Sequence, residues 1–370
     1  MSHRRKRSTI AIVLLVLLLL AGAIYLRKIA PPEAARLLPE SDGIIYLNFR
    51  AVRSAAHFSD HPVEHAPDYQ RFIDATGIQF ERDLDEAAFA LHQLPNPRGP
   101  NGAVAFSDVF VGHFDGRRLA NYLGTLAASQ EVYAGHTIFN IPNEGRTVRV
   151  AILGYDIVAV SNTPTAEQIH SMIDRYRTAA LPFSGSSLLS KYYRQVPLLS
   201  FAWGIGRIAL PLGKTGGLHV MGVRLPIPVD ATFTASLRWI GKIHLRVEEI
   251  APNESTAADS TESLQMLLTL VHSVETSGGV QPFDPETRGF LDSMEIVRHD
   301  NRAVLTATVP TPLLEHMLTS SSGMKAIPGS GAATTPQKGA AAPAAPSAAR
   351  SATRSAPATS AGKPAIPKKP

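Results

Sequence analysis

The sequence predicts an α+β protein with antiparallel sheets. It is organised as two related halves, and a ferredoxin-like fold is one candidate for each half. Two observations lead to this fold class. Between residues 29 and 324 the spacing of apolar residues alternates between two, typical of strands, and about 3.6, typical of helices. Several alternating segments follow one another across short turns, which favours antiparallel hairpins. An apolar segment near the N-terminus adds one predicted transmembrane helix.

The first predicted element is this transmembrane helix, over Ile10–Leu26, a run of seventeen residues without a charge. At about 1.5 Å per residue it would extend roughly 25 Å, which is short but tolerable for the bilayer core. Four basic residues precede the run and two follow it, so the N-terminus is expected in the cytoplasm and the body outside the inner membrane. The small residues Ala21-Gly22-Ala23 leave an alternative, in which cleavage after Ala23 releases a secreted protein.

The charge of the chain is distributed unevenly. Residues 1–28 carry six Lys or Arg and residues 325–370 carry seven, and neither segment holds an acidic residue. The middle of the chain therefore sets 23 basic residues against all 31 acidic ones, an excess of negative charge that argues against nucleic acid as a partner. The sequence contains no cysteine, which excludes disulfide bonds and thiol chemistry.

The C-terminal segment 325–370 differs in composition from the rest. It consists mainly of Ala, Pro, Ser, Thr, Gly and Lys, so it cannot bury enough apolar surface to offset the entropy of ordering and is predicted to be disordered. Its basic character suggests contact with an anionic envelope polymer or a protein. The alternative is a solvated tail without a specific partner.

Residues 29–180 form the first predicted half. The turn Gly154-Tyr155-Asp156 joins two predicted strands directly, which predicts an antiparallel hairpin. The strands are expected at Gly43–Phe49, Ala103–Phe114, His136–Ile141, Thr147–Leu153 and Asp156–Ser161. The helices are expected at Asp68–Gly77, Asp83–Leu91, Gly116–Ala128 and Thr165–Arg177.

Residues 181–324 form the second predicted half, which repeats features of the first. Thr163–Glu167 and Thr311–Glu315 each follow a predicted hairpin and begin with Thr-Pro, where Thr is the expected N-cap and Pro the first helical residue. A duplicated unit is therefore expected. The strands are predicted at Val196–Gly206, Ala231–Ile250 with a break near Gly241, Ser293–Arg298 and Ala303–Val309, and the helices at Ser260–Glu275, Pro285–Ser293 and Pro312–Leu318.

Two segments carry a resemblance to known proteins. The residues "LLPESDGIIYLNFRAVR" (Leu37–Arg53) and "ATGIQFERDLDEAAFAL" (Ala75–Leu91), after a short N-terminal anchor, resemble a group of bacterial membrane-anchored, extracytoplasmic α+β repeat proteins of unknown function. The resemblance covers mainly residues 37–91. It implies a fold style and a location, and it transfers no catalytic residue.

One short motif is compatible with metal chemistry. "HPVEH" fits the zinc motif H-x-x-E-H, in which His61 and His65 would ligate zinc and Glu64 would act as general base, and His57 is a further potential ligand. Against this hypothesis, Pro62 prevents one continuous helix from His57 to His65. A polar surface loop is the preferred interpretation, with no catalytic residue, metal ligand or cofactor assigned.

Three functions follow from these observations. The leading one is a membrane-anchored cell-envelope protein that acts as a non-catalytic interaction or structural module. The second is a zinc-dependent hydrolase that uses His61, Glu64 and His65. The third is a binder of a small ligand or a lipid in a cleft between the two halves. The sequence identifies no binding residues for the first or the third.

Overall fold

The computed structural model describes residues 30–56, 65–178, 185–207, 218–220, 223–225, 228, 230–276 and 284–313. All of these residues belong to one compact unit. Among them, no helix combines the length and the apolar character needed to cross a membrane. The predicted transmembrane helix Ile10–Leu26 and the predicted tail 325–370 lie outside the described ranges.

The first half of the chain contains seven strands and six helices among the described residues. In chain order they are α2 (Glu33–Leu37), β1 (Gly43–Asn48), α3 (Phe49–Ala56), α4 (Pro67–Thr76), α5 (Phe80–Asp83), β2 (Leu84–Gln93), β3 (Val104–Gly112), α6 (Gly116–Leu126), β4 (Ser129–Tyr133), β5 (His136–Asn143), β6 (Arg146–Ile152), β7 (Ile157–Ser161) and α7 (Glu167–Arg177).

The second half follows with another set of elements. They are α8 (Ser187–Tyr192), the 3₁₀ turn η2 (Tyr193–Gln195), β8 (Ser200–Gly206), β9 (Leu218–Val220), β10 (Val223–Leu225), β11 (Thr232–Ile240), β12 (Lys242–Ile250), α9 (Glu254–Thr276), α10 (Pro285–Asp292), β13 (Glu295–His299) and β14 (Arg302–Val309). Strands β9 and β10 form a separate two-stranded sheet.

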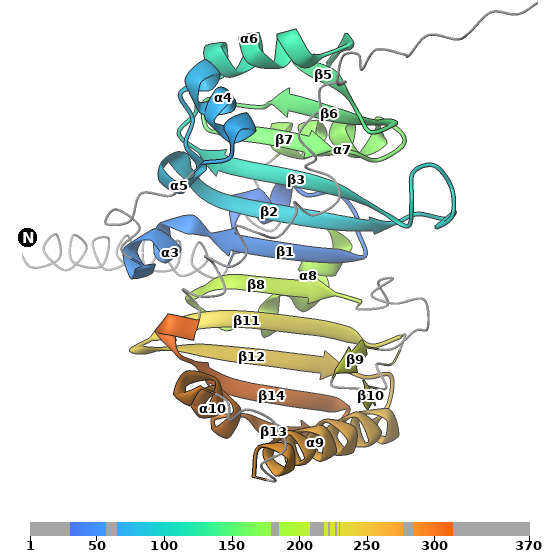
Figure 1. Cartoon of the computed structure of the whole chain (residues 1–370). Helices are drawn as coiled ribbons and strands as arrows, with labels where there is room; N and C mark the ends of the chain where they lie inside the picture. The colour runs from blue at the N-terminus through green and yellow to red at the C-terminus, as the bar shows by residue number, and fades with distance from the viewer. Residues whose placement is uncertain are drawn as a thin grey trace, which may run out of the picture. The chain divides into compact units, whose positions relative to one another are not determined.

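The other strands form one twelve-stranded antiparallel sheet (Figure 1). Its order is β13-β14-β12-β11-β8-β1-β2-β3-β7-β6-β5-β4. The two halves meet where β1 and β8 pair, from Gly43 opposite Gly206 to Leu47 opposite Ala202. The predicted α+β class with antiparallel strands is therefore confirmed.

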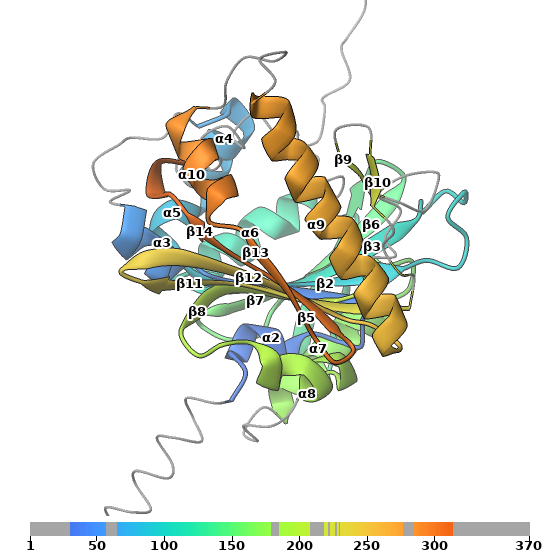
Figure 2. The ribbon, with the colours of Figure 1, turned by 90° about the horizontal axis from the view of Figure 1, so that it is seen from below.

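Helices cover both faces of this sheet (Figure 2). We call the face that carries α2, α7 and α8 the lower face, and the face that carries α4, α6, α9 and α10 the upper face. The larger core cluster lies below, where the fully buried Ala34, Leu37 and Leu38 of the α2 region pack with Ile44 of β1. A smaller cluster lies on the upper face. There Leu119 and Leu123 of α6 belong to one cluster with Phe139, Val150 and Val158 of the sheet.

One predicted helix is wrong. Asp83–Leu91 was expected to be helical, because its Ala, Leu and Glu residues favour helices. The segment instead forms most of strand β2, which lies between β1 and β3 in the sheet. Ala87, Ala88 and Ala90 are completely buried there, since small side chains allow both faces of an inner strand to be covered. Tertiary pairing outweighs intrinsic propensity in this segment.

Two finer expectations also differ from the structure. Helix α7 begins at Glu167 with Ala166 as its N-cap, whereas the Thr163 hydroxyl donates a hydrogen bond to the Thr165 carbonyl at 3.0 Å and stabilises the turn after β7. A ferredoxin-like half is a βαββαβ unit that contributes four strands. The twelve strands of the sheet are more than two such halves would supply.

Candidate functional site

His65 is the only residue of the predicted zinc motif within the described ranges, since His57, His61 and Glu64 lie outside them. Its Nε2 lies 3.5 Å from Oε1 of Glu81, and its Nδ1 lies 3.3 Å from Oε1 of Gln70. The ring also meets Tyr69 edge-on, at 4.9 Å between ring centroids. Within the described part of the chain, no group of three or more His, Cys, Asp or Glu side chains could hold a metal ion.

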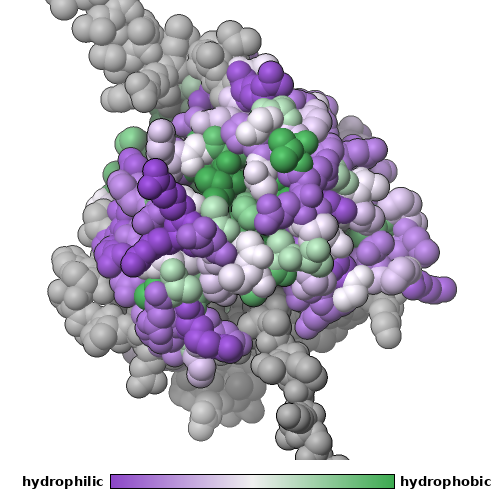
Figure 3. Space-filling model, turned by 90° about the horizontal axis from the view of Figure 1, so that it is seen from above, coloured by the Kyte–Doolittle hydropathy of each residue, from purple (hydrophilic) through white to green (hydrophobic). Residues whose placement is uncertain are grey.

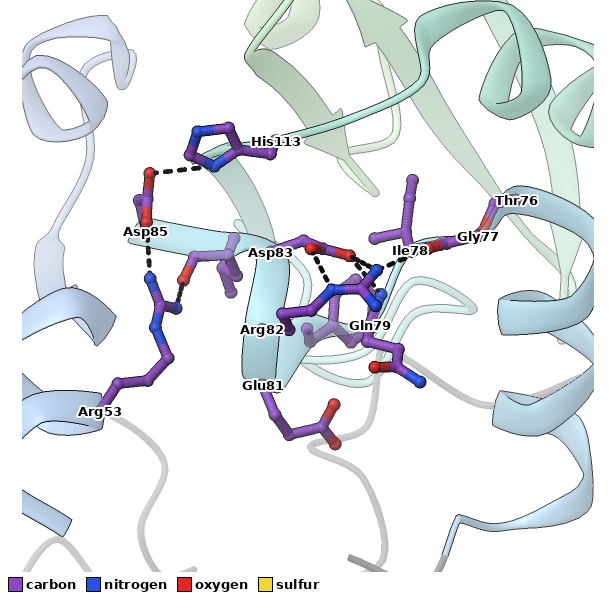
Figure 4. A network of polar contacts seen from close by, with 12 residues as sticks. Arg53, Thr76, Gly77, Ile78, Gln79, Glu81, Arg82, Asp83, Asp85 and His113 are labelled. Carbon is purple, nitrogen blue, oxygen red and sulfur yellow. Dashed lines mark hydrogen bonds and ion pairs between the residues drawn. The ribbon is translucent and has the colours of Figure 1, made fainter. Parts of the chain in front are cut away.

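A second group of polar contacts lies in the turn that precedes β2, next to Glu81 in the chain (Figure 4). Arg82 donates to both carboxylate oxygens of Asp83, at 2.6 and 2.7 Å, and to the carbonyl of Gly77 at 3.1 Å. The backbone N–H of Gln79 also donates to Asp83, at 2.8 Å. These contacts hold the short helix α5 against the end of α4 and direct the chain into β2.

Asp85 is the most enclosed carboxylate of this polar network, with only 4% of its side chain exposed. It accepts hydrogen bonds from Arg50 and Arg53 of α3, both at 2.6 Å, and His113, which follows β3, lies 3.5 Å away. Figure 4 shows the contacts with Arg53 and His113. The hydrogen bond from Arg50, together with that from Arg53, lowers the pKa of Asp85 although burial opposes its ionisation. Two guanidinium groups therefore bind this carboxylate. This arrangement suits Asp85 to joining α3 to β2 rather than to transferring a proton.

Asp108 is a second enclosed carboxyl group, on the upper face of β3. Its neighbours across the sheet are Phe89 of β2 and Val160 of β7. The Oδ1 atom is buried and has no hydrogen-bond partner. Burial raises the pKa of Asp108 to about 7. Neither this residue nor its environment was singled out in the sequence, because one Asp in an alternating strand has no distinctive pattern.

A cavity of about 200 Å³ lies in the second half, along β11, β12 and β14. We call it the lower-face cavity. Its lining residues are Pro197, Ser236, Arg238, His244, Leu245, Arg246, Ser293, Thr306, Ala307 and Thr308. The third function predicted from the sequence uses a cleft between the two halves, and this cavity is a separate feature within the second half. The sequence does contain a signal for this polar surface. In the hairpin around Gly241, polar residues recur at every second position on either side, which places them on one face of the two strands.

An apolar patch lies at the other end of the sheet. Strand β4 is the edge strand of the sheet, and its Val132 is 74% exposed. Leu126 at the end of α6 is 43% exposed. Figure 3 views the molecule from this end and shows apolar side chains gathered within a polar border. Nothing among the described residues indicates what would cover the patch.

Comparisons with known proteins give only distant similarity. No protein-family model matches the chain, and no curated protein matches it. The chain is similar to crystal form III of TP0453, with 11% identity and a TM-score of 0.41, over 78% of this chain and 99% of that one. It is also similar to crystal form I of TP0453, with 11% identity and a TM-score of 0.39, over 79% and 98% of the two chains. Similarity at this level carries no argument about function, and the resemblance of residues 37–91 to membrane-anchored repeat proteins stays a prediction.

Proposed function

We propose that the chain is a single-pass cell-envelope protein, held in the inner membrane by Ile10–Leu26, whose body is a non-catalytic interaction or structural module outside the cytoplasm. The observation that carries this proposal is the short distance in sequence between the apolar run and the core. Helix α2 begins at Glu33, and its residues Ala34 and Ala35 are completely buried. Six residues separate Leu26 from Glu33, and even fully extended they span only about 20 Å. An anchor at Ile10–Leu26 would therefore hold the body next to the membrane.

The polar network around Asp85 supports a scaffold role over catalysis. Its carboxylates are engaged by arginines and backbone N–H groups, and His65 is engaged by Glu81 and Gln70. A zinc hydrolase would need His65 free to ligate a metal with His61. No described contact favours that alternative.

We also propose that the two halves, residues 29–180 and 181–324, are related by duplication. The order of five strands supports this: from the junction outward it is β1-β2-β3-β7-β6 in the first half and β8-β11-β12-β14-β13 in the second. The helices agree, because α2 and α8 precede the first strand of each set on the lower face, and α6 and α9 follow the third strand on the upper face (Figure 2). Strands β4 and β5 would then be an addition to the first half.

Cysteine labelling tests the proposed topology, because the chain contains no native cysteine. We expect Tyr155→Cys, at a position that is 97% exposed, to react with a membrane-impermeant maleimide in spheroplasts. Ser2→Cys should react only after lysis. Labelling of Ser2→Cys in intact spheroplasts would contradict the proposed orientation.

Two further measurements separate the remaining versions of this proposal. If N-terminal sequencing shows that the mature protein begins at Ile24, the secreted alternative is correct and the membrane-anchored version is wrong. For the tail, we expect the full chain to cosediment with isolated anionic envelope polymer and the variant ending at Met324 to lose this association. If both chains cosediment equally, the tail does not contribute to binding of the polymer.

A further inference from the structure

We propose that the lower-face cavity binds an oxyanion of the phosphate type. This inference goes beyond the proposed envelope function and does not depend on the membrane anchor. It rests on the arrangement of hydrogen-bond donors in the cavity, on a buried guanidinium nitrogen without a partner, and on the local excess of positive charge.

The donors form two parallel rows across three strands. Ser236 of β11 is opposite Arg246 of β12, which is opposite Thr306 of β14. The next row contains the remaining three donors in the same strand order, Arg238, His244 and Thr308. Residues opposite each other in antiparallel strands point to the same face with Cα atoms about 5 Å apart, and successive rows lie about 7 Å apart. Six polar side chains therefore project from one small area of the lower face.

Arg238 contributes the clearest indication of a missing partner. Its Nε atom is buried and has no hydrogen-bond partner. Among the described residues, no hydrogen bond or ion pair of its guanidinium group is found, although five N–H groups are available for donation. A buried donor that makes no hydrogen bond costs free energy, which a bound acceptor would recover.

The charges around the cavity do not balance. Two acidic residues lie beside the rows: Glu248, which is already paired with Arg246 at 2.9 Å and with Arg302, and Glu295 of β13, which is opposite Thr306. The three arginines on this face, Arg238, Arg246 and Arg302, outnumber them. Arg238 and His244 are directly opposite each other on neighbouring strands, an arrangement that is unfavourable whenever both are charged. A bound anion would offset this repulsion, whereas a bound cation would increase it.

The size and the chemistry of the cavity point to a tetrahedral oxyanion. A volume of about 200 Å³ is several times the roughly 30 Å³ that one water occupies in the liquid, so it has room for a phosphate group with some water. Arginine matches phosphate oxygens in geometry and charge, and serine and threonine hydroxyls donate to the oxygens that remain. The phosphate can belong to a small soluble molecule or to a lipid headgroup, and both sources present the same oxygens.

Inorganic phosphate is the first probe. With the full-length chain in a non-ionic detergent, we expect saturable binding in isothermal titration calorimetry and a rise in the unfolding temperature as phosphate is added. We expect Arg238→Gln to weaken this binding at least about tenfold, because a hydrogen bond to a charged group is lost. Arg298→Gln is the matched control, since Arg298 is exposed, lies on neighbouring β13 and points to the opposite face. It should bind phosphate as the unchanged chain does.

The stability of the phosphate-free protein distinguishes a binding role from a structural one. If Arg238 serves an absent ligand, Arg238→Gln should keep or raise the unfolding temperature, because it removes the charge of a guanidinium group whose buried Nε has no hydrogen-bond partner. A lowered unfolding temperature combined with unchanged phosphate binding would overturn the proposal. So would the absence of saturable binding, or equal binding by Arg238→Gln and Arg298→Gln, which would indicate an adventitious ion only.

A second probe distinguishes the source of the phosphate. We compare glycerol phosphate in solution with vesicles of phosphatidylglycerol, and use phosphatidylcholine vesicles as the reference for association through the apolar segment alone. If glycerol phosphate binds and Arg238→Gln weakens this binding, the natural ligand is a soluble phosphate ester. Extra retention on phosphatidylglycerol that is lost in Arg238→Gln, but kept in Arg298→Gln, supports a lipid headgroup. Failure of both probes to depend on Arg238 would overturn the assignment, whatever the topology of the chain.

Discussion

At the residue scale, the contrast between enclosed and exposed ion pairs gives a first prediction. Asp85→Asn removes a nearly buried carboxylate that accepts from Arg50 and Arg53, so we expect it to lower the free energy of unfolding by about 2 kcal/mol at pH 7. The matched control is Asp68→Asn, which removes an exposed pair with Arg71 and should cost well under about 1 kcal/mol. Urea denaturation measures both values. Equal losses in the two variants would show that the enclosure of Asp85 contributes little.

Asp108 leads to a prediction about pH. In the unfolded chain an Asp releases its proton near pH 3.9, whereas burial raises the folded pKa of Asp108 to about 7. The folded state therefore binds the extra proton between these values, and its stability falls as pH rises through this window. Asp108→Asn stays neutral, so we expect it to gain stability over the unchanged chain by about 2 kcal/mol more at pH 8 than at pH 5. Urea denaturation at the two pH values tests this, and a constant difference would contradict it.

At the element scale, local patterns predicted elements well where local and tertiary preferences agree. The hairpin of β6 and β7 and the break at Gly241 between β11 and β12 were visible in the alternation and the turns. Strand β2 was not, because its alanines are good helix formers and only pairing with β1 and β3 makes it a strand. The lower-face cavity was missed for a similar reason. The hairpin around Gly241 sets the donors of β11 and β12 opposite each other, but it does not reveal the register of β14, which adds Thr306 and Thr308.

Helix α6 offers an element-scale prediction. The Asp115 carboxylate accepts from the backbone N–H groups of Arg117 and Arg118, both at 3.1 Å, and so satisfies two donors at the start of the helix. We expect Asp115→Ala to lower the free energy of unfolding by about 1 kcal/mol, and Asp115→Asn, which keeps an accepting oxygen, to lower it by less. Chemical denaturation of the two variants provides the test. An alanine variant as stable as the asparagine variant would show that the cap is unimportant.

At the scale of the whole molecule, the sequence indicated two similar halves but not how they join. Both halves contribute their first strand to the junction, and β1 and β8 pair there in one continuous sheet. The contact is reinforced on the lower face, where Tyr46 stacks on Trp203 at 5.3 Å between ring centroids. The pairing of two strands more than 150 residues apart has no local signal, so the single sheet could not be predicted from the pattern of either half.

The junction also sets the last prediction, which concerns two glycines of β8 on the same face of the sheet. A Cβ atom added at Gly206 would lie 2.6 Å from the Cα of Gly43 and 2.9 Å from the Asp42 carbonyl oxygen, so the two strands would have to separate. At Gly204 the nearest atoms would be 3.5 and 3.8 Å away, which are ordinary contacts. We therefore expect Gly206→Ala to lower the free energy of unfolding by about 2 kcal/mol or more, and Gly204→Ala to change it by less than about 1 kcal/mol.

Hydrogen exchange measured by mass spectrometry shows whether this change reaches both halves. If the β1–β8 ladder joins the halves into one cooperative sheet, Gly206→Ala should reduce amide protection in β2 and β3 as well as in β11 and β12. Gly204→Ala should leave all four strands protected. Loss of protection in β8 and β11 alone, with β1 and β2 unchanged, would mean that the halves are independent units that share an edge. A pair of independent halves would also explain why each keeps its own helices on both faces, so this experiment decides between a duplicated pair of domains and one enlarged domain.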